Sequence, residues 1–484
     1  MQIERVAVTE LERLGGPAGV AAHLRALVPD GESVAGDVRE IVERVRDDGD
    51  AGVLHYTRLL DTKGVEPSPL RVAPEDLDEA IKRLPLDLVA GLQVTIANVA
   101  QVADAGVGRD ASVELPQGQH VTLRELPVDS AAVYVPGGRA PYPSTVAMGV
   151  VTARAAGVFD VAVCSPPGAD GEIDATILGA CRLCGVERVY RMGGAQAIAA
   201  LAYGTESVER VDVIVGPGNL YVQEAKAQLT AHVGIDGFAG PSDLLVVLGA
   251  ELRPGDVRLA ALDMLAQGEH GAGSLVVAVS AGPGVIEALA AELQRLHETA
   301  GSAGVDAAAA SGAGASVTPG AGVAAGTFAL VDALDAEQAI QIANAFAPEH
   351  LQLIGADVEA HAPRIRFAGC LFVGAASATA FGDYVAGSNH ILPTVGAARF
   401  ASMLSPRHFR RRMAEVRVDP AGAGKLASAG VPIARAEGFE WHARSMEARA
   451  PGALGGPGGG PDLDTGNARS DAGGTIGDNG GQDG

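Results

Sequence analysis

Two short polar motifs contain side chains suited to acid–base and metal chemistry. Glu349 and His350 follow Pro348, and a carboxylate can activate water while a histidine titrates near neutral pH. Adjacent residues do not share a helix face, so joint action by this pair requires a loop or a helix start. The same residues also suit the acidic first turn of a helix, so the pattern leaves both interpretations open.

Gln267 and His270 are three residues apart, a spacing that predicts two side chains on one helix face. An imidazole near carboxamide and carboxylate groups suits a borderline cation such as Zn²⁺. A histidine on a helix is also common without any ligand. A third polar segment, 382–390, contains Asp383 and His390 together with two glycines, a composition typical of binding loops.

Short apolar runs that end in turn residues predict the buried strands that must position these motifs. These runs cover 131–135, 161–164 and 211–215, then 244–247, 274–279 and 370–373. Helical patterns between them indicate the βαβ rhythm of parallel sheets. Parallel sheets bind ligands at the carboxyl ends of their strands, so we expect the functional loops there.

The predicted fold class is α/β, with two Rossmann-like parallel-sheet domains, a helical N-terminal region and a small C-terminal arm. The helical region, 1–120, is expected to contribute to the second α/β domain. The other predicted boundaries are 121–240 for the first α/β domain, 241–390 for the second, 391–450 for a C-terminal helical region and arm, and 451–484 for a disordered Gly/Asp-rich tail.

Composition excludes several classes of protein. The 484 residues include 36 Lys+Arg and 59 Asp+Glu, a net charge of −23, which disfavours nucleic acids and anionic membranes as partners. The first residues are charged and no 18-residue apolar run stands out, so we expect a cytoplasmic protein without a membrane span. Four cysteines are too few for a disulfide scaffold. Cys181 and Cys184 lie in an apolar helical stretch, which favours a buried pair over a metal site.

Neither a complete GxGxxG nor a GxxxxGK[ST] motif follows a predicted strand. The nearest pattern is Gly216-Pro217-Gly218-Asn219, which by itself indicates a tight turn.

Taken together, the motifs resemble histidinol dehydrogenase from about residue 35 to residue 449. The matching segments, in chain order, are 134–138, 193–200, 216–219, 239–242, 266–271, 347–351, 382–394 and 437–442. The resemblance implies a zinc-dependent homodimer that oxidises L-histidinol through L-histidinal to L-histidine with two NAD, the final steps of histidine biosynthesis. It also implies that NAD binds to an incomplete Rossmann-like domain at 121–240, consistent with the missing glycine motif.

The resemblance further implies roles for individual residues. His350 would accept the carbinol proton and Glu349 would activate water. The implied Zn²⁺ ligands, which would also contact substrate, are Gln267, His270, Asp383 and His442. Further substrate contacts would be Ser242, His390 and Glu437, and NAD contacts would be Tyr134, Gln196 and Asn219. The arm that contains Glu437 and His442 would enter the active site of the partner subunit.

Two alternatives remain at this point. A related NAD-dependent dehydrogenase of another small diol, such as a sulfonated propanediol, would keep the Glu–His pair but lose His390 and the closing Glu437 and His442. A metal-binding module without catalysis would not need Glu349 and His350 beside a nucleotide domain. The Ala/Gly-rich segment 299–326 is expected to be a mobile surface stretch.

Overall fold

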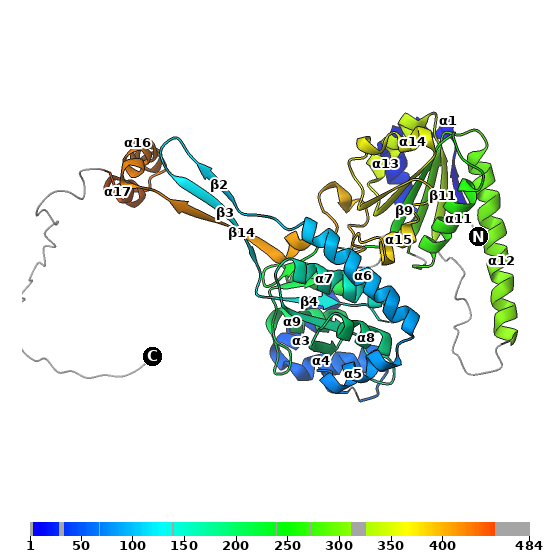
Figure 1. The fold of residues 1–484 in the computed structure, drawn as a ribbon, viewed down its shortest axis with the longest axis horizontal. Coiled ribbons are helices and arrows are strands. Elements are labelled where there is room, and N and C mark those ends of the chain that lie inside the picture. The colour runs from blue at the N-terminus through cyan, green and yellow to red at the C-terminus, as the bar shows by residue number, and fades with distance from the viewer. Residues whose placement is uncertain are drawn as a thin grey trace, which may run out of the picture. The chain divides into compact units, whose positions relative to one another are not determined.

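The computed structural model describes residues 3–28, 33–66, 68–137, 140–238, 240–271, 273–310 and 326–450 (Figure 1). The chain forms two compact units. One comprises Met1–Arg109 and Glu125–Arg412, and the other comprises Asp110–Arg124 and Met413–Gly484. The predicted tail, 451–484, and residues 311–325 of the Ala/Gly-rich segment lie outside the described residues.

The first unit contains a parallel sheet of five strands in the order β6-β5-β4-β7-β8. The strands are β4 (Ser130–Tyr134), β5 (Asp160–Ser165), β6 (Arg188–Arg191), β7 (Val213–Val215) and β8 (Gly234–Ile235). Its helices are α7 (Pro143–Ala155), α8 (Ala175–Leu183), α9 (Gly194–Tyr203) and α10 (Leu220–Gln228). Numbered along the chain, the order is 3-2-1-4-5, that of a dinucleotide-binding sheet without its sixth strand. The predicted incomplete Rossmann-like architecture is therefore present.

A second parallel sheet in the same unit has the order β1-β11-β10-β9-β12-β13. The strands are β1 (Ile3–Val6), β9 (Asp243–Leu248), β10 (Leu275–Ser280), β11 (Thr327–Asp332), β12 (His350–Ile354) and β13 (Cys370–Val373). The helices after β9 are α11 (Asp256–Gly268), α12 (Val285–Ala310), α13 (Ala336–Phe346), α14 (Ala356–Glu359) and α15 (Thr379–Tyr384). Helices cover both faces of this sheet, which explains why β9 and β10 are apolar without interruption.

The N-terminal region divides between the two sheets, which differs from the predicted association of 1–120 with the second domain. Only β1, α1 (Val8–Leu11) and α2 (Gly16–Arg25) join the second sheet. The following elements pack on the first sheet: α3 (Ala35–Asp48), α4 (Asp50–Tyr56), the π-helix η1 (Thr57–Asp61), α5 (Pro74–Arg83) and α6 (Leu86–Ala105). The apolar faces of these helices show which sheet they cover, because Ile41 is buried in the same core as Ile198 and Leu77 in the same core as Ile177.

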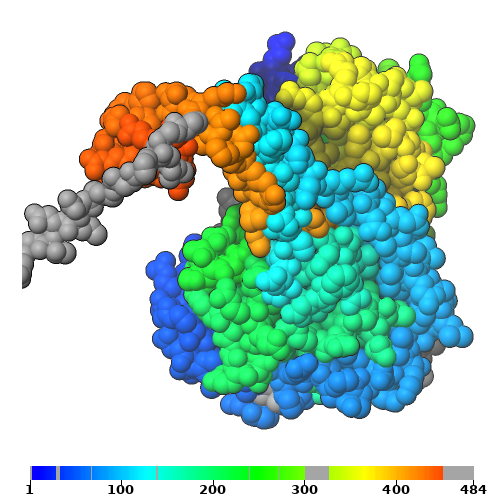
Figure 2. All heavy atoms as spheres, turned by 60° about the vertical axis from the view of Figure 1, so that its left-hand side comes forward, coloured from blue at the N-terminus to red at the C-terminus, as the bar shows by residue number. Residues whose placement is uncertain are grey.

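Helix α6 is the one described helix that is long and apolar enough to cross a membrane by length and composition, with a mean hydropathy of 1.4. This finding corrects the expectation that no such run exists. Leu92 and Val99 of α6 are buried in the same core as Val133 of β4 and Val150 of α7, so its apolar side chains contribute to that core. Thr95 and Ala103 are buried as well, and the opposite face of the helix lies on the molecular surface, in the light-blue region near residue 100 (Figure 2).

The second unit is small. Its sheet has the order β14-β3-β2 and consists of β2 (Ala111–Glu114), β3 (His120–Pro127) and β14 (Arg410–Arg417). The last residues of β3 and the first residues of β14 belong to the first unit. Helices α16 (Pro420–Ala436) and α17 (Glu440–Glu447) share a core of alanine and valine side chains. Three 3₁₀-helices complete the first unit: η2 (Ala362–Arg364), η3 (Ala397–Arg399) and η4 (Pro406–Phe409).

Candidate active site and nucleotide cavity

Glu349 and His350 lie at the amino end of β12, where His350 is the first residue of the strand. The parallel register pairs His350 with Leu244, so Ser242 and Asp243 at the start of β9 lie beside Glu349. The pair is therefore neither in a helical first turn nor at the carboxyl ends of strands, where we expected the functional loops. Glu349 precedes the strand and His350 begins it, and both side chains are buried.

Hydrogen bonds fix the Glu349 carboxylate. Its Oε2 accepts from Ser242 Oγ at 2.5 Å and from the Asp243 backbone N–H at 2.9 Å. The Glu349 N–H donates in return to the Asp243 carboxylate at 2.8 Å, and Arg25 of α2 binds that carboxylate at 2.6 Å. Burial raises the pKa of Glu349 to about 7, within the range where a carboxylate can accept and return a proton.

His350 lies between two carboxylates. Its Nε2 is 3.4 Å from Asp383 Oδ1, its Nδ1 is 3.7 Å from Glu349 Oε2, and its ring stacks on Phe372. Burial lowers the pKa of His350, but the Glu349 and Asp383 charges more than offset that effect and raise it to about 9. Burial likewise opposes ionisation of Asp383, yet the neighbouring His350 holds the pKa of that carboxyl below its usual value.

Three further predicted site residues of the first unit, Gln267, His270 and His390, lie near this pair. Gln267 Nε2 donates to Ser242 Oγ at 2.5 Å, which leaves its Oε1 as an acceptor. His270 lies two residues beyond the end of α11 rather than within it, and its N–H reaches the Gln267 carbonyl at 3.3 Å. His390 Nδ1 contacts the Asp383 carbonyl at 2.8 Å, and its Nε2 contacts Thr145 Oγ1 of α7 at 3.2 Å.

The electrostatics of His270 suit a neutral ligand nitrogen. The side chain is partly exposed, yet desolvation by the surrounding protein atoms lowers its pKa, and the nearby Asp383 opposes that effect. Desolvation also lowers the pKa of His390. Within the residues that the structure describes, no three His, Cys, Asp or Glu side chains converge closely enough to hold a metal ion.

Glu437 and His442 belong to the second unit. Glu437 ends α16, His442 lies in the first turn of α17, and both are exposed. The His442 ring packs on Phe439, with 5.2 Å between the ring centroids. The first unit therefore brings together Ser242, Gln267, His270, Glu349, His350, Asp383 and His390.

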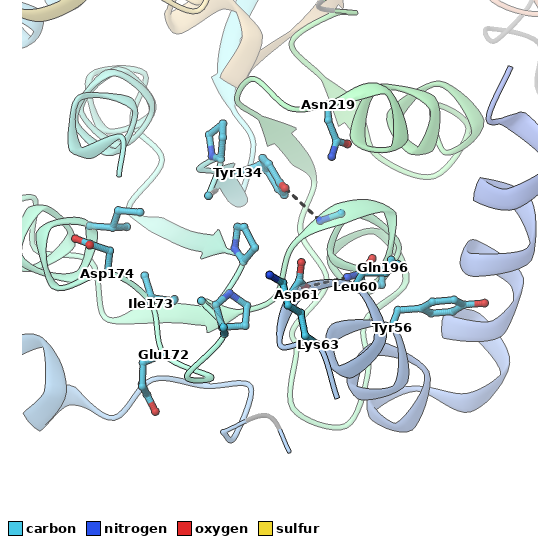
Figure 3. Close-up of a pocket in the computed structure, with 18 of the residues that line it drawn as sticks. Tyr56, Leu60, Asp61, Lys63, Tyr134, Glu172, Ile173, Asp174, Gln196 and Asn219 are labelled. Atoms are coloured by element: carbon cyan, nitrogen blue, oxygen red, sulfur yellow. Dashed lines mark hydrogen bonds between the residues drawn. The ribbon is translucent and has the colours of Figure 1, made fainter. Parts of the chain in front are cut away.

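A cavity of about 1340 Å³ lies at the carboxyl ends of the first sheet (Figure 3). Tyr134 ends β4, Gln196 lies in the first turn of α9, and Asn219 is the N-cap of α10; all three line the cavity. Tyr134 Oη accepts from the Gly194 N–H at 3.2 Å, and Asn219 Oδ1 caps α10 through the Val222 N–H. At this sheet the cavity lies at the carboxyl ends of the strands, where we expected the functional loops.

A buried ion pair holds the 216–219 turn. Lys226 Nζ donates to the Gly216 carbonyl at 2.6 Å and to Asp236 Oδ1 at 2.7 Å. Asp236 Oδ2 in turn accepts from the Gly216 N–H at 2.7 Å. Gly216 has φ +118°, and a Cβ there would lie 2.1 Å from the Tyr134 carbonyl oxygen, so glycine is required. The turn that carries Asn219 is thus anchored from both sides.

Three of these residues, Arg25, Thr145 and Asp243, were not found from the sequence. Arg25 is 218 positions from Asp243, and Thr145 is 245 positions from its partner His390, so no local pattern marks these contacts. The only sequence signal for any of them is that Asp243 directly follows the matching segment 239–242. Cys181 and Cys184 are buried and unpaired, as their apolar surroundings predicted.

A dinucleotide-type sheet, a large cavity at its ligand-binding edge and a buried acid–base pair define an α/β dehydrogenase. The histidinol dehydrogenase family model matches residues 27–450. Histidinol dehydrogenase of Gluconobacter oxydans is 38% identical over 433 residues, covering 89% of this chain and 96% of the relative. The enzyme of Parasynechococcus marenigrum is 40% identical over 427 residues, covering 86% and 91%.

The structural comparison agrees. The crystal structure of histidinol dehydrogenase from Elizabethkingia anophelis superposes with a TM-score of 0.81 at 27% identity, covering 92% of this chain and 98% of that one. The chain belongs to the histidinol dehydrogenase family, NAD-dependent oxidoreductases of histidine biosynthesis.

Proposed function

We propose that this chain oxidises L-histidinol to L-histidine in two steps at one site, with Glu349 and His350 as the catalytic residues. The observation that supports the proposal is the burial of both side chains at the start of β12, among polar groups that can bind a small cationic substrate. His390 contacts Thr145 of α7, and α7 begins beyond the carboxyl end of β4. The Glu349–His350 pair therefore lies on the side that faces the first sheet, the proposed nucleotide-binding sheet.

The two residue types divide the proton transfers. In the first step the neutral form of His350, which predominates above its raised pKa of about 9, accepts the carbinol proton while hydride leaves for NAD, and the bound aldehyde results. In the second step Glu349 accepts a proton from the water that attacks the aldehyde, and the hydrate then loses hydride to a second NAD. Ser242 and the Asp243 N–H hold the Glu349 carboxylate in place throughout.

We propose a Zn²⁺ site formed by Gln267, His270, Asp383 and His442 of the partner subunit. The donor set suits the ion, because Gln267 retains a free amide oxygen and desolvation keeps the His270 ring neutral. Bound there, Zn²⁺ would orient the imidazole and amino nitrogens of the substrate and offset the charge of Asp383. Ser242, His390 and Glu437 are proposed as further substrate contacts.

The proposed homodimer exchanges its arms, so that Glu437 and His442 complete the site of the other subunit. At the start of α17 the side chains of Trp441 and of the N-cap residue Phe439 are 79% and 54% exposed, and burial against a second copy would remove that apolar surface from water. His350→Ala and His442→Ala should each be inactive alone. Co-expression of the two variants should restore about a quarter of wild-type activity, because about half of the dimers are then mixed and each mixed dimer has one intact site of two. Inactive mixed dimers would show that each arm serves its own subunit.

The test of the reaction is the amount of NADH formed per substrate. Two NADH for each L-histidinol support the proposal. One NADH, or activity only with another small diol, would support the alternative dehydrogenase. Because the pathway draws on the NAD pool of the cell, we place the enzyme in the cytoplasm, without nucleic-acid or membrane partners.

A further inference from the structure

The carboxylates that line the nucleotide cavity differ in their burial. Six line it: Asp37, Glu40, Asp61, Asp170, Glu172 and Asp174. Asp61 alone among these is half-buried, and the other five are exposed. Figure 3 shows Asp61 at the centre of the cavity wall, beside Gln196 and Lys63.

Most of the exposed carboxylates already serve the protein. Asp174 caps α8 through the Thr176 N–H, and Glu172 binds the buried Arg191 at 2.8 Å. Asp170 accepts from the Glu172 N–H, and Asp37 binds the Tyr221 hydroxyl at 3.2 Å. Each of these four carboxylates therefore already has a partner within the protein.

The Asp61 carboxylate is held only weakly by its neighbours. Its one hydrogen bond within the described part of the chain is from Gln196 Nε2, at 3.3 Å. The Gln196 side chain is fully buried, and its Oε1 has no partner among the described residues. Asp61 is also the last residue of the π-helix η1, a distortion that is frequent at functional sites because it redirects a side chain. A carboxylate and a buried amide with unused capacity thus face the same cavity.

The topology indicates which part of a dinucleotide lies there. In sheets of this order the first three strands hold the adenosine half, and an acidic residue beyond the second strand binds the adenine-ribose hydroxyls. Here the second strand, β5, is followed by Pro166 and Pro167, which cannot do so. Gln196, the partner of Asp61, begins α9 directly after the third strand, β6. Asp61 therefore lies on the adenosine side.

We propose that Asp61 selects NAD over NADP, by accepting hydrogen bonds from the adenine-ribose hydroxyls and repelling a 2′-phosphate. The inference rests on the proposed use of the cavity for NAD and adds the residue that decides between the two cofactors. Removing the carboxylate charge should relax discrimination, because a like charge beside the phosphate is the repulsive element.

Burial raises the pKa of Asp61 to about 7, so the repulsion should depend on pH. The carboxylate is ionised well above that value and neutral well below it, so selection against the 2′-phosphate should weaken as pH falls. Besides the other carboxylates of the cavity, Lys63 lies beside Asp61 and Tyr134 of β4 lines the same cavity. Burial raises the pKa of the Tyr134 hydroxyl, so it stays neutral through this range.

The experiment measures binding of ADP-ribose and 2′-phospho-ADP-ribose by calorimetry, which needs no catalysis. The wild type should prefer ADP-ribose by roughly tenfold or more at pH 8.5, and less at pH 5.5. Asp61→Asn should remove most of that preference and most of its change with pH. The matched control is Glu40→Gln, an exposed carboxylate of the same cavity, which should leave both unchanged.

Equal loss of preference in both variants would overturn the proposal, since general cavity charge would then be responsible. A preference that Asp61→Asn leaves intact would overturn it as well, while NADH formation from L-histidinol would still support the proposed function. Failure of both ligands to bind the wild type would refute the nucleotide assignment of the cavity together with the role of Asp61.

Discussion

Replacing Glu349 by Gln should separate the two half-reactions. The glutamine amide has the size of the carboxyl group, and its Oε1 can accept the same bonds from Ser242 Oγ and the Asp243 N–H, at 2.5 and 2.9 Å. The site geometry should therefore survive, and only the ability to take a proton from water is lost. Loss of a general base typically costs about 10²–10⁴ in rate, or about 2.7–5.4 kcal/mol of activation free energy.

The assay follows NADH in two separate reactions. With L-histidinol the variant should form NADH from the first step at close to the wild-type rate and then stall at one equivalent per site. With added L-histidinal its rate should fall by the full factor. The control is Glu337→Gln on α13, which changes an exposed carboxylate bound to Arg364 and should alter neither reaction. An equal fall in both reactions would refute the assignment of hydration to Glu349.

Three further predictions concern the metal, the nucleotide turn and the tail. Chelation should abolish activity without unfolding the chain, since the proposed ligands lie at the edge of a large core, and added Zn²⁺ should restore turnover; full activity after verified metal removal would contradict the zinc site. Lys226→Met should lower the free energy of unfolding in urea by about 3–5 kcal/mol, because it leaves the largely buried Asp236 carboxylate unpaired. The same change should raise the KM for NAD more than it lowers kcat. An unchanged KM would show that the ion pair does not support nucleotide binding. Truncation after residue 450 should leave activity and melting temperature unchanged, because 451–484 contains few apolar side chains, and a clear drop in melting temperature would show a structural contribution.

Local pattern predicted the repeating elements well. The runs at 131–135, 161–164 and 244–247 became β4, β5 and β9, since a strand covered on both faces needs an unbroken apolar segment. Pattern did not reveal which sheet each N-terminal helix covers. An amphipathic stripe such as that of α3 shows that a face is buried but does not name the surface against which it packs.

The sequence by itself determined the α/β class, the family and the small set of polar motifs, because strand periodicity and ordered motifs are local properties of the chain. The tertiary structure decided where those motifs meet. His350 lies at the amino end of β12 rather than at a carboxyl end, and the parallel register with β9 places Ser242 and Asp243 beside Glu349. The contact from Arg25 to Asp243 and that from Asp61 to Gln196 likewise arise only from packing, which brings together side chains 218 and 135 residues apart.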